Sequence, residues 1–179
     1  MKYSVLIITL ILIFSCNSPE ARRPKTHSTK NFYKEVLEQN KKLNNLEERK
    51  IEHLIKKDTS NIYQISNSGF WYSYIKKDTF GLVFPKTDDV VTLKYNITDV
   101  YDNVIYPEKE ISYKIDKENF ITGLSDGIKL MKEKEEVVFI IPSYRAYGIT
   151  GDGNRIGINK TLKSKVKLIE IKRQINENN

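Results

Sequence analysis

The segment "FITGLSDGIKLMKEKEEVVFIIPSYRAYG", Phe120 to Gly148, contains a change of periodicity that decides the fold class. Its first part has apolar residues at i, i+4 and i+7, which is helical spacing: Leu124, Ile128 and Met131. The apolar run "VVFII" follows and stops at Pro142, as expected for a strand of a buried sheet. We therefore expect a short helix over 121–131 and a strand over 135–142.

The sequence on both sides of this segment predicts further strands. Aromatic or alternating runs of β-prone residues occupy 70–75, 90–101, 111–115 and 161–171. In the last run, one face would carry Leu162, Ser164, Val166 and Leu168. Asp102-Asn103 predicts a hairpin turn. Several strands crossed by one short helix indicate an α+β domain with an antiparallel sheet.

The N-terminus has the features of an export signal. Lys2 precedes the apolar run Val5 to Phe14, which is too short to span a bilayer as a helix and has the length of a signal-peptide core. The run ends at "IFSC", where Cys16 would become a lipidated first residue of the mature chain, as in bacterial lipoproteins. An ordinary cleaved signal is the alternative. Cys16 is the single cysteine, so the chain forms no internal disulfide.

Residues 16–60 connect this signal to the domain and carry much of the net charge of +7, with eleven Lys and Arg against seven Asp and Glu. The sequence predicts a signal over 1–15, a flexible tether over 16–31, a charged helical extension over 32–65 and a folded domain over 66–175. The extension could pack on the domain, pair with a second copy or remain partly solvated. Its basic excess fits either anionic head groups or a solvated tether. The folded part has no basic stripe, so nucleic acid is not an expected partner.

Residues 69–173 resemble the FKBP-type peptidyl-prolyl isomerases. The resemblance rests on four blocks in the family order: "VTLKYNITDVYDNVIY", "FITGLSDGIKLMKEKEEVVFIIP", "SYRAYG" and "RIGINKTLKSKVKLIEI". It implies an antiparallel β half-barrel of five to six strands wrapped around one short α-helix. The whole layout looks most like the gliding-motility-associated isomerase lipoproteins of gliding bacteria, anchored in the cell envelope and facing the periplasm.

The resemblance also implies a pocket for proline-containing exported polypeptides, with no cofactor and no metal. The family's pocket residues map to Tyr95, Tyr106, Ile111, Phe120, Ile121, Leu124, Tyr147, Ile156 and Ser164. Tyr95 would form an aromatic wall. The backbone N–H of Ile121 and the hydroxyl of Tyr147 would donate to substrate carbonyls. The segment 151–157 would form a flexible flap beside the pocket.

Three positions depart from the pattern that the resemblance implies. Pro107 stands where many members carry an aspartate, Leu124 replaces a frequent tryptophan, and Ser164 replaces an aromatic residue. These changes predict a roomier slot that lacks one carboxylate, with weak to moderate isomerase activity. A proline-peptide-binding chaperone or scaffold without useful catalysis is the alternative function.

Overall fold

The computed structural model describes residues 29–79 and 81–173 and divides the chain into two compact units, residues 1–37 and 38–179. The predicted signal, Cys16 and most of the tether therefore lie outside the described residues. A single helix, α2 (Thr29–Lys57), runs across the boundary between the units. Within the described ranges, we find no helix with both the length and the apolar character needed to cross a membrane.

One antiparallel sheet forms the body of the second unit. Its strands are β1 (Gln64–Ile65), β2 (Trp71–Lys76), β3 (Val90–Thr98), β4 (Val104–Lys114), β5 (Glu136–Ile141) and β6 (Leu162–Lys172). They lie in the order β1-β2-β5-β6-β3-β4, and every neighbouring pair is antiparallel. The predicted α+β class is confirmed, with six strands in the half-barrel.

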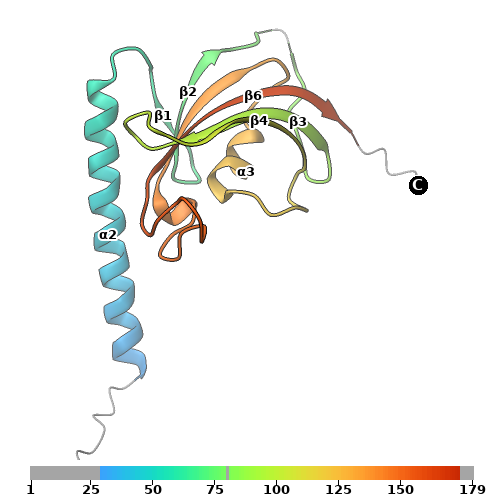
Figure 1. Cartoon of the computed structure of the whole chain (residues 1–179). Coiled ribbons are helices and arrows are strands. Elements are labelled where there is room, and N and C mark those ends of the chain that lie inside the picture. The colour runs from blue at the N-terminus through green and yellow to red at the C-terminus, as the bar shows by residue number, and fades with distance from the viewer. Residues whose placement is uncertain (1–28, 80, 174–179) are drawn as a thin grey trace, which may run out of the picture. The chain divides into compact units, whose positions relative to one another are not determined.

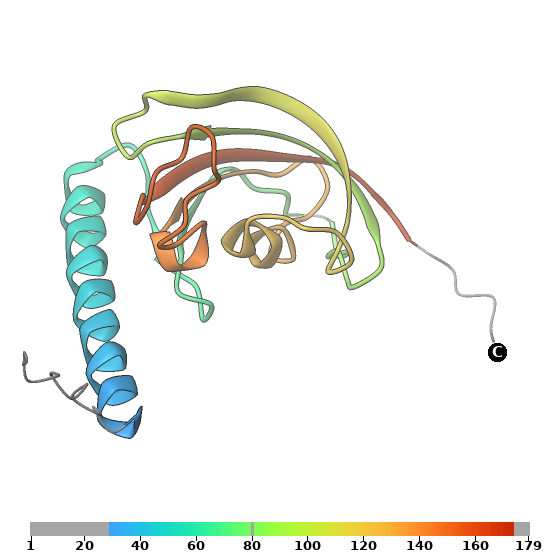
Figure 2. The ribbon, with the colours of Figure 1, turned by 60° about the horizontal axis from the view of Figure 1, so that its bottom comes forward.

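A short helix, α3 (Thr122–Ile128), lies against the concave side of the curved sheet (Figures 1 and 2). Two glycines allow this close approach, because a Cβ on Gly127 would lie 2.5 Å from the ring of Phe139 and one on Gly123 would lie 2.6 Å from Ile141. The helix ends earlier than the predicted residue 131. Turns continue it, with Met131 N–H donating to the Ile128 carbonyl at 3.0 Å, so the apolar stripe remains buried.

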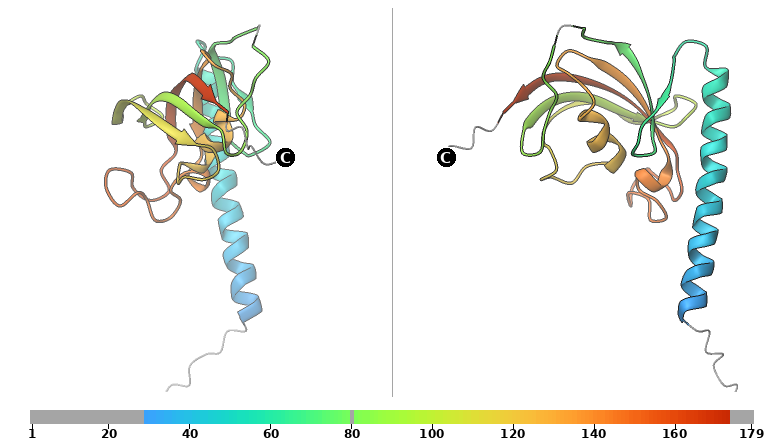
Figure 3. Two further views of the ribbon diagram at one scale, coloured as in Figure 1. Left: turned by 90° about the vertical axis from the view of Figure 1, so that its right-hand side faces the viewer. Right: turned by 180° about the vertical axis from the view of Figure 1, so that it is seen from behind.

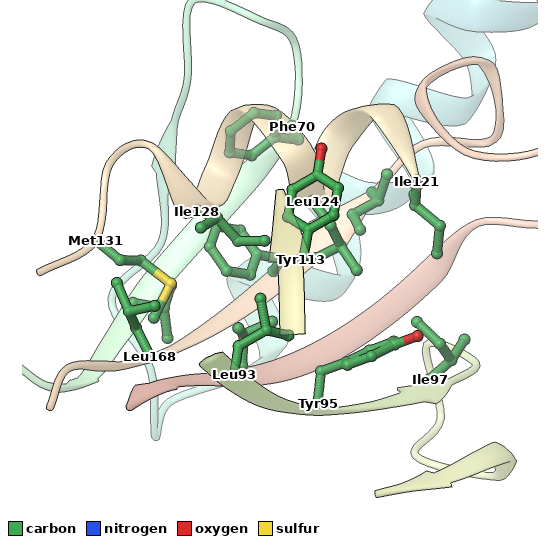
Figure 4. Close-up of a cluster of buried hydrophobic side chains, with 14 of the residues drawn as sticks. Phe70, Leu93, Tyr95, Ile97, Tyr113, Ile121, Leu124, Ile128, Met131 and Leu168 are labelled. Atoms are coloured by element: carbon green, nitrogen blue, oxygen red, sulfur yellow. The ribbon is translucent and has the colours of Figure 1, made fainter. Parts of the chain in front are cut away.

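The core lies between α3 and the sheet, and the two further views of the ribbon show the same layering (Figure 3). Leu124 and Ile128 of α3, with Met131 from the turn after the helix, meet Leu93 of β3 and Leu168 of β6, and all five side chains are fully buried (Figure 4). The predicted inward face of the last strand is confirmed, since each of its four residues is buried: Leu162, Ser164, Val166 and Leu168.

The C-terminal part of α2 belongs to the second unit and packs on the domain. Ile51 is only 1% exposed and forms a small buried cluster with Trp71 of β2 and Ile140 of β5. Leu43 and Leu46, earlier on the same helix, are largely exposed. Of the three possibilities that the sequence left open for this helix, packing on the domain is therefore realised at its C-terminal end.

Candidate functional site

A cleft of about 400 Å³ opens at one end of the sheet, where β3, β4 and the loops around α3 and after β5 come together. The residues that line it are Tyr95, Ile97, Tyr106, Lys109, Asn119, Phe120, Ile121, Tyr147, Asp152 and Asn154. Five of the nine residues predicted for the pocket are thus brought together by the fold: Tyr95, Tyr106, Phe120, Ile121 and Tyr147.

Packed aromatic rings form one wall of this cleft. Tyr95 meets Phe120 edge to face, with ring centroids 5.3 Å apart, and Phe120 in turn packs on Tyr113 at 4.9 Å. Tyr113 is anchored to α3, because its hydroxyl and the hydroxyl of Ser125 lie 2.8 Å apart and share a hydrogen bond. Such ring pairs stabilise by about 0.5–1.5 kcal/mol beyond their burial, so contacts within the protein hold this wall together.

Tyr147 reaches the cleft from a tight turn. Pro142 ends β5, a 3₁₀ turn (Ser143–Arg145) follows, and Gly148 takes a positive φ of 55° that suits glycine. Tyr147 is half-buried. Burial, followed by the negative charge of Asp152, raises the pKa of its hydroxyl above the ordinary value, so the group stays protonated and able to donate.

Asp152 brings a carboxylate into the cleft from the loop that follows Tyr147. It accepts a hydrogen bond from the Tyr106 hydroxyl and two more from the N–H groups of Asn154 (2.9 Å) and Ile156 (2.8 Å). Burial opposes its ionisation, but these hydrogen bonds outweigh burial and lower its pKa. The carboxylate that the sequence predicts to be missing is the one at position 107. Pro107 is exposed, and the acidic group comes from a different loop.

Two cations lie over the aromatic rings at the mouth of the cleft. The ammonium group of Lys109 lies 5.4 Å from the ring centroid of Tyr95, its cross-strand neighbour. The guanidinium of Arg155 lies 5.6 Å from the ring centroid of Tyr106 and donates to the Ile105 carbonyl at 3.1 Å. Cation–π contacts of this kind help to hold the two rings in place.

The loop 151–157, predicted as a flexible flap, is closed by its own hydrogen bonds between residues 152 and 156. Besides the two bonds to its carboxylate, Asp152 donates its backbone N–H to the Ile156 carbonyl at 3.0 Å. Gly151 has a φ of 69°, and a Cβ there would lie 2.4 Å from the same carbonyl oxygen. The tight closure explains why glycine stands at this position and how Asp152 is aimed at Tyr106.

Four predicted pocket residues do not line the cleft among the described residues: Ile111, Leu124, Ile156 and Ser164. Leu124 is fully buried in the core, one turn behind Ile121 (Figure 4). Ile156 is also buried. Ile111 is partly buried on β4 opposite Leu93, toward the other end of the strand pair.

Ser164 supports the cleft from behind instead of facing it. Its hydroxyl donates to the backbone carbonyl of Asn96 at 2.6 Å, and the Asn96 side chain accepts from the Lys165 N–H at 2.9 Å. The pairing of β3 with β4 shifts register between Tyr95 and Ile97, so Asn96 lies at an irregularity where the ladder is interrupted. An aromatic side chain at 164 could not supply this hydrogen bond.

Sequence reasoning did not name half of the cleft residues, although it placed the segment 151–157 beside the pocket. These residues are Ile97, Lys109, Asn119, Asp152 and Asn154. For Ile97 a signal existed, because it stands two residues beyond Tyr95 on the same strand. Lys109 could have been found only from the register of β3 with β4. The Asp152-Gly153 dipeptide indicates a turn but not which tyrosine the aspartate contacts.

Comparisons with known proteins show which family the sequence matches. Residues 81–169 match the family model for FKBP-type peptidyl-prolyl cis-trans isomerases. A protein of Neisseria meningitidis serogroup B, named "Probable FKBP-type peptidyl-prolyl cis-trans isomerase FkpA", is 36% identical over 91 residues. The match covers 49% of this chain and 33% of that relative, so the chain spans only about a third of the relative's length.

Solved structures share the fold. The crystal structure of FkpA from Escherichia coli matches with a TM-score of 0.59 at 22% identity, over 96% of this chain and 83% of its own. A peptidyl-prolyl cis-trans isomerase from Pseudomonas syringae pv. tomato matches with a TM-score of 0.57 at 17% identity, over 68% of this chain and 90% of its own. With the four sequence blocks, the matched family model and this fold, the domain at residues 81–169 belongs to the FKBP-type peptidyl-prolyl cis-trans isomerase family.

Proposed function

We propose that the chain is a peptidyl-prolyl cis-trans isomerase that acts on proline-containing segments of exported polypeptides. The observation that carries this proposal is the cleft of about 400 Å³, in which Tyr95, Ile121 and Tyr147 meet although they come from three separate segments. An aromatic wall suits a pyrrolidine ring, and donors at the rim suit the carbonyls on either side of it.

The proposed chemistry needs no bond to be made or broken. Rotation about an X–Pro bond is opposed by amide resonance, with a barrier of about 18–20 kcal/mol, and takes tens to hundreds of seconds uncatalysed. The twisted amide has less charge separation than the planar one, so a cleft that excludes water favours it. Two donors would bind carbonyls of the substrate: the N–H of Ile121, just ahead of α3, and the hydroxyl of Tyr147. They would accelerate isomerisation most if these hydrogen bonds are stronger to the twisted amide than to the planar one.

The direct test is isomerisation of short X–Pro peptides by the chain purified in detergent, with several different residues before the proline. We expect faster relaxation than in enzyme-free controls, with rates that depend on the residue before proline because Asp152 and Lys109 stand at the mouth. No acceleration by a protein shown to be folded would refute the enzymatic function.

A second candidate function is proline-peptide binding without useful catalysis. Its support is Pro107, which supplies neither a charge nor an N–H where many family members carry an aspartate. Calorimetric titration with the same peptides separates the two functions, because it detects binding whether or not isomerisation is accelerated. Saturable binding with an uncatalysed isomerisation rate would favour the binding module.

Lipid anchoring through Cys16 is the third part of the proposal, and it rests on the apolar core and the "IFSC" sequence. Acyl chains contribute about 0.8 kcal/mol for each buried CH₂, so two or more chains anchor a protein stably. Cys16→Ser should move the protein to the soluble fraction of envelope preparations, whereas the matched variant Ser18→Ala should stay with the membranes. Continued membrane binding of Cys16→Ser would contradict the anchor.

Components of an envelope gliding machine are the client proteins that the layout of the chain suggests.

A further inference from the structure

Three hydrogen bonds converge on the carboxylate of Glu47, on the domain-facing side of α2. Oε1 accepts from the Ser143 backbone N–H at 2.7 Å and from the Thr161 hydroxyl at 2.5 Å, and Oε2 accepts from the Ser143 hydroxyl at 2.7 Å. Glu47 is half-buried and Ser143 is buried. Hydrogen bonds to an ionised acceptor are roughly twice as strong as neutral ones, so this is a strong local tie.

The two residues that donate hydrogen bonds to Glu47 lie at the two ends of the loop that carries Tyr147 and Asp152. Ser143 is the second residue after the end of β5, and Thr161 directly precedes β6. One carboxylate therefore closes the base of a segment whose interior lines the cleft.

A short chain of backbone hydrogen bonds connects Ser143 to Tyr147. The Ser143 carbonyl accepts the N–H groups of Ala146 at 2.9 Å and Gly148 at 2.8 Å, the two residues that flank Tyr147. The Gly148 carbonyl in turn accepts the N–H of Asn159 at 2.7 Å, which ties the turn to the returning stem. Movement of Ser143 would thus be transmitted to the backbone on both sides of Tyr147.

We infer that Glu47 is a positioning residue for Tyr147, through which α2 tunes the site. Glu47 lies outside residues 81–169, the region that matches the family model. The inference rests on the proposed isomerase function, because its effect on rate requires that Tyr147 donates to the substrate. Small displacements of a donor lower the rate steeply, since the hydrogen bond must be aligned in the transition state.

Kinetics of three variants of the full chain test the inference. Glu47→Ala removes all three acceptor contacts, and we expect kcat/KM to fall about fivefold, mostly through kcat. Glu47→Gln keeps a carbonyl acceptor and should recover most of the rate. Glu52→Ala removes the same side chain from an exposed position on the same helix and should leave the rate unchanged.

A double-variant comparison separates positioning from a general loss of stability. If Glu47 acts through Tyr147, Glu47→Ala should change kcat/KM by less than about twofold in a Tyr147→Phe background. An equal fivefold loss in both backgrounds, or no loss with Tyr147 present, would overturn the inference.

Amide hydrogen exchange provides a readout that does not depend on activity. The amides of Ala146 and Gly148 should exchange at least about threefold faster in Glu47→Ala than in Glu52→Ala, because their opening is no longer restrained at Ser143. Unchanged exchange at these amides would overturn the positioning role. If the wild-type chain shows no isomerase activity, the proposed function fails, and exchange together with peptide affinity then decides whether Glu47 positions the loop.

Discussion

Tyr147 presents a protonated hydroxyl at an aromatic-lined cleft, because burial and then the charge of Asp152 raise its pKa above the ordinary value of 10.0. Tyr147→Phe removes the donor and keeps the ring. We expect kcat/KM for X–Pro peptides to fall roughly two- to tenfold, the value of one neutral hydrogen bond. Tyr101→Phe is the matched control, since that hydroxyl belongs to an exposed tyrosine. Equal rates for the two variants would show that Tyr147 only fills space.

Asp152 links the loop after Tyr147 to the wall residue Tyr106, and it gives the domain a pH dependence with a definite sign. Its pKa in the folded state is lowered from 3.8, so it stabilises the fold above that pH, and this stabilisation is lost as pH falls through the folded-state pKa. Asp152→Asn should therefore lower the urea midpoint at pH 7. The difference from wild type should shrink toward pH 3. A difference that is the same at both pH values would mean that ionisation of Asp152 contributes nothing.

The residues of the cleft differ in how far sequence alone can place them. Tyr95 lies within β3 and Ile121 directly precedes α3, so their positions follow once those two elements are predicted. Asp152 meets Tyr106 across 46 residues of chain, and only the closed loop conformation brings the two together. Ser164 donates a hydrogen bond to Asn96, where the strand pairing is irregular, and so has a structural role. A shift of strand register cannot be recognised from a single sequence.

At the scale of elements, the hydrophobic pattern predicted the strands that bury one face. The alternating run in 161–171 matches β6 within one residue at each end. β4 spans Val104–Lys114, much longer than the predicted 111–115. It is an edge strand whose middle is exposed and polar, "PEKE", so backbone pairing with β3 defines it and no apolar alternation is present.

The contact of α3 with β5 makes a sharp prediction, because two effects of one substitution oppose each other. Gly127→Ala gains about 1 kcal/mol of helix propensity. The new Cβ would lie 2.5 Å from the fully buried Phe139 ring, and overpacking of this kind costs about 1–3 kcal/mol or more. We expect a net decrease in the free energy of unfolding, measured by urea denaturation. Gly157→Ala, where a Cβ meets nothing within 4 Å, should stay within about 0.5 kcal/mol of wild type. A stabilised Gly127→Ala would mean that the helix can move away from the sheet.

At the scale of the molecule, the folded unit is larger than the region that matches the family. The family model begins at residue 81, yet the main core includes Phe70 and a second cluster joins Ile51 to Trp71 and Ile140. Sequence pattern predicted a charged helix before the domain and could not show its attachment. The attachment depends on Ile51, the partly buried Ile55 and the carboxylates of Glu47 and Glu48, and two isoleucines are too few to produce a clear apolar stripe.

This attachment predicts that the C-terminal part of α2 unfolds together with the sheet. Ile51→Ala should lower the free energy of unfolding by about 2–4 kcal/mol, because it leaves a cavity beside Trp71 and Ile140. Leu43→Ala, on an exposed position of the same helix, should change it by no more than about 0.5 kcal/mol.

Two probes of the same denaturation decide whether the unit is cooperative. Trp71 is the single tryptophan and lies in the cluster with Ile51, so its fluorescence reports on the attachment, while far-ultraviolet circular dichroism reports on the helices and the sheet. If α2 and the sheet form one cooperative unit, both signals shift to the same lower midpoint in Ile51→Ala. If the helix were an independent tether, the fluorescence transition would move alone and the sheet would keep its wild-type midpoint. Coincident transitions would show that the folded isomerase domain includes the C-terminal part of the helix that precedes it.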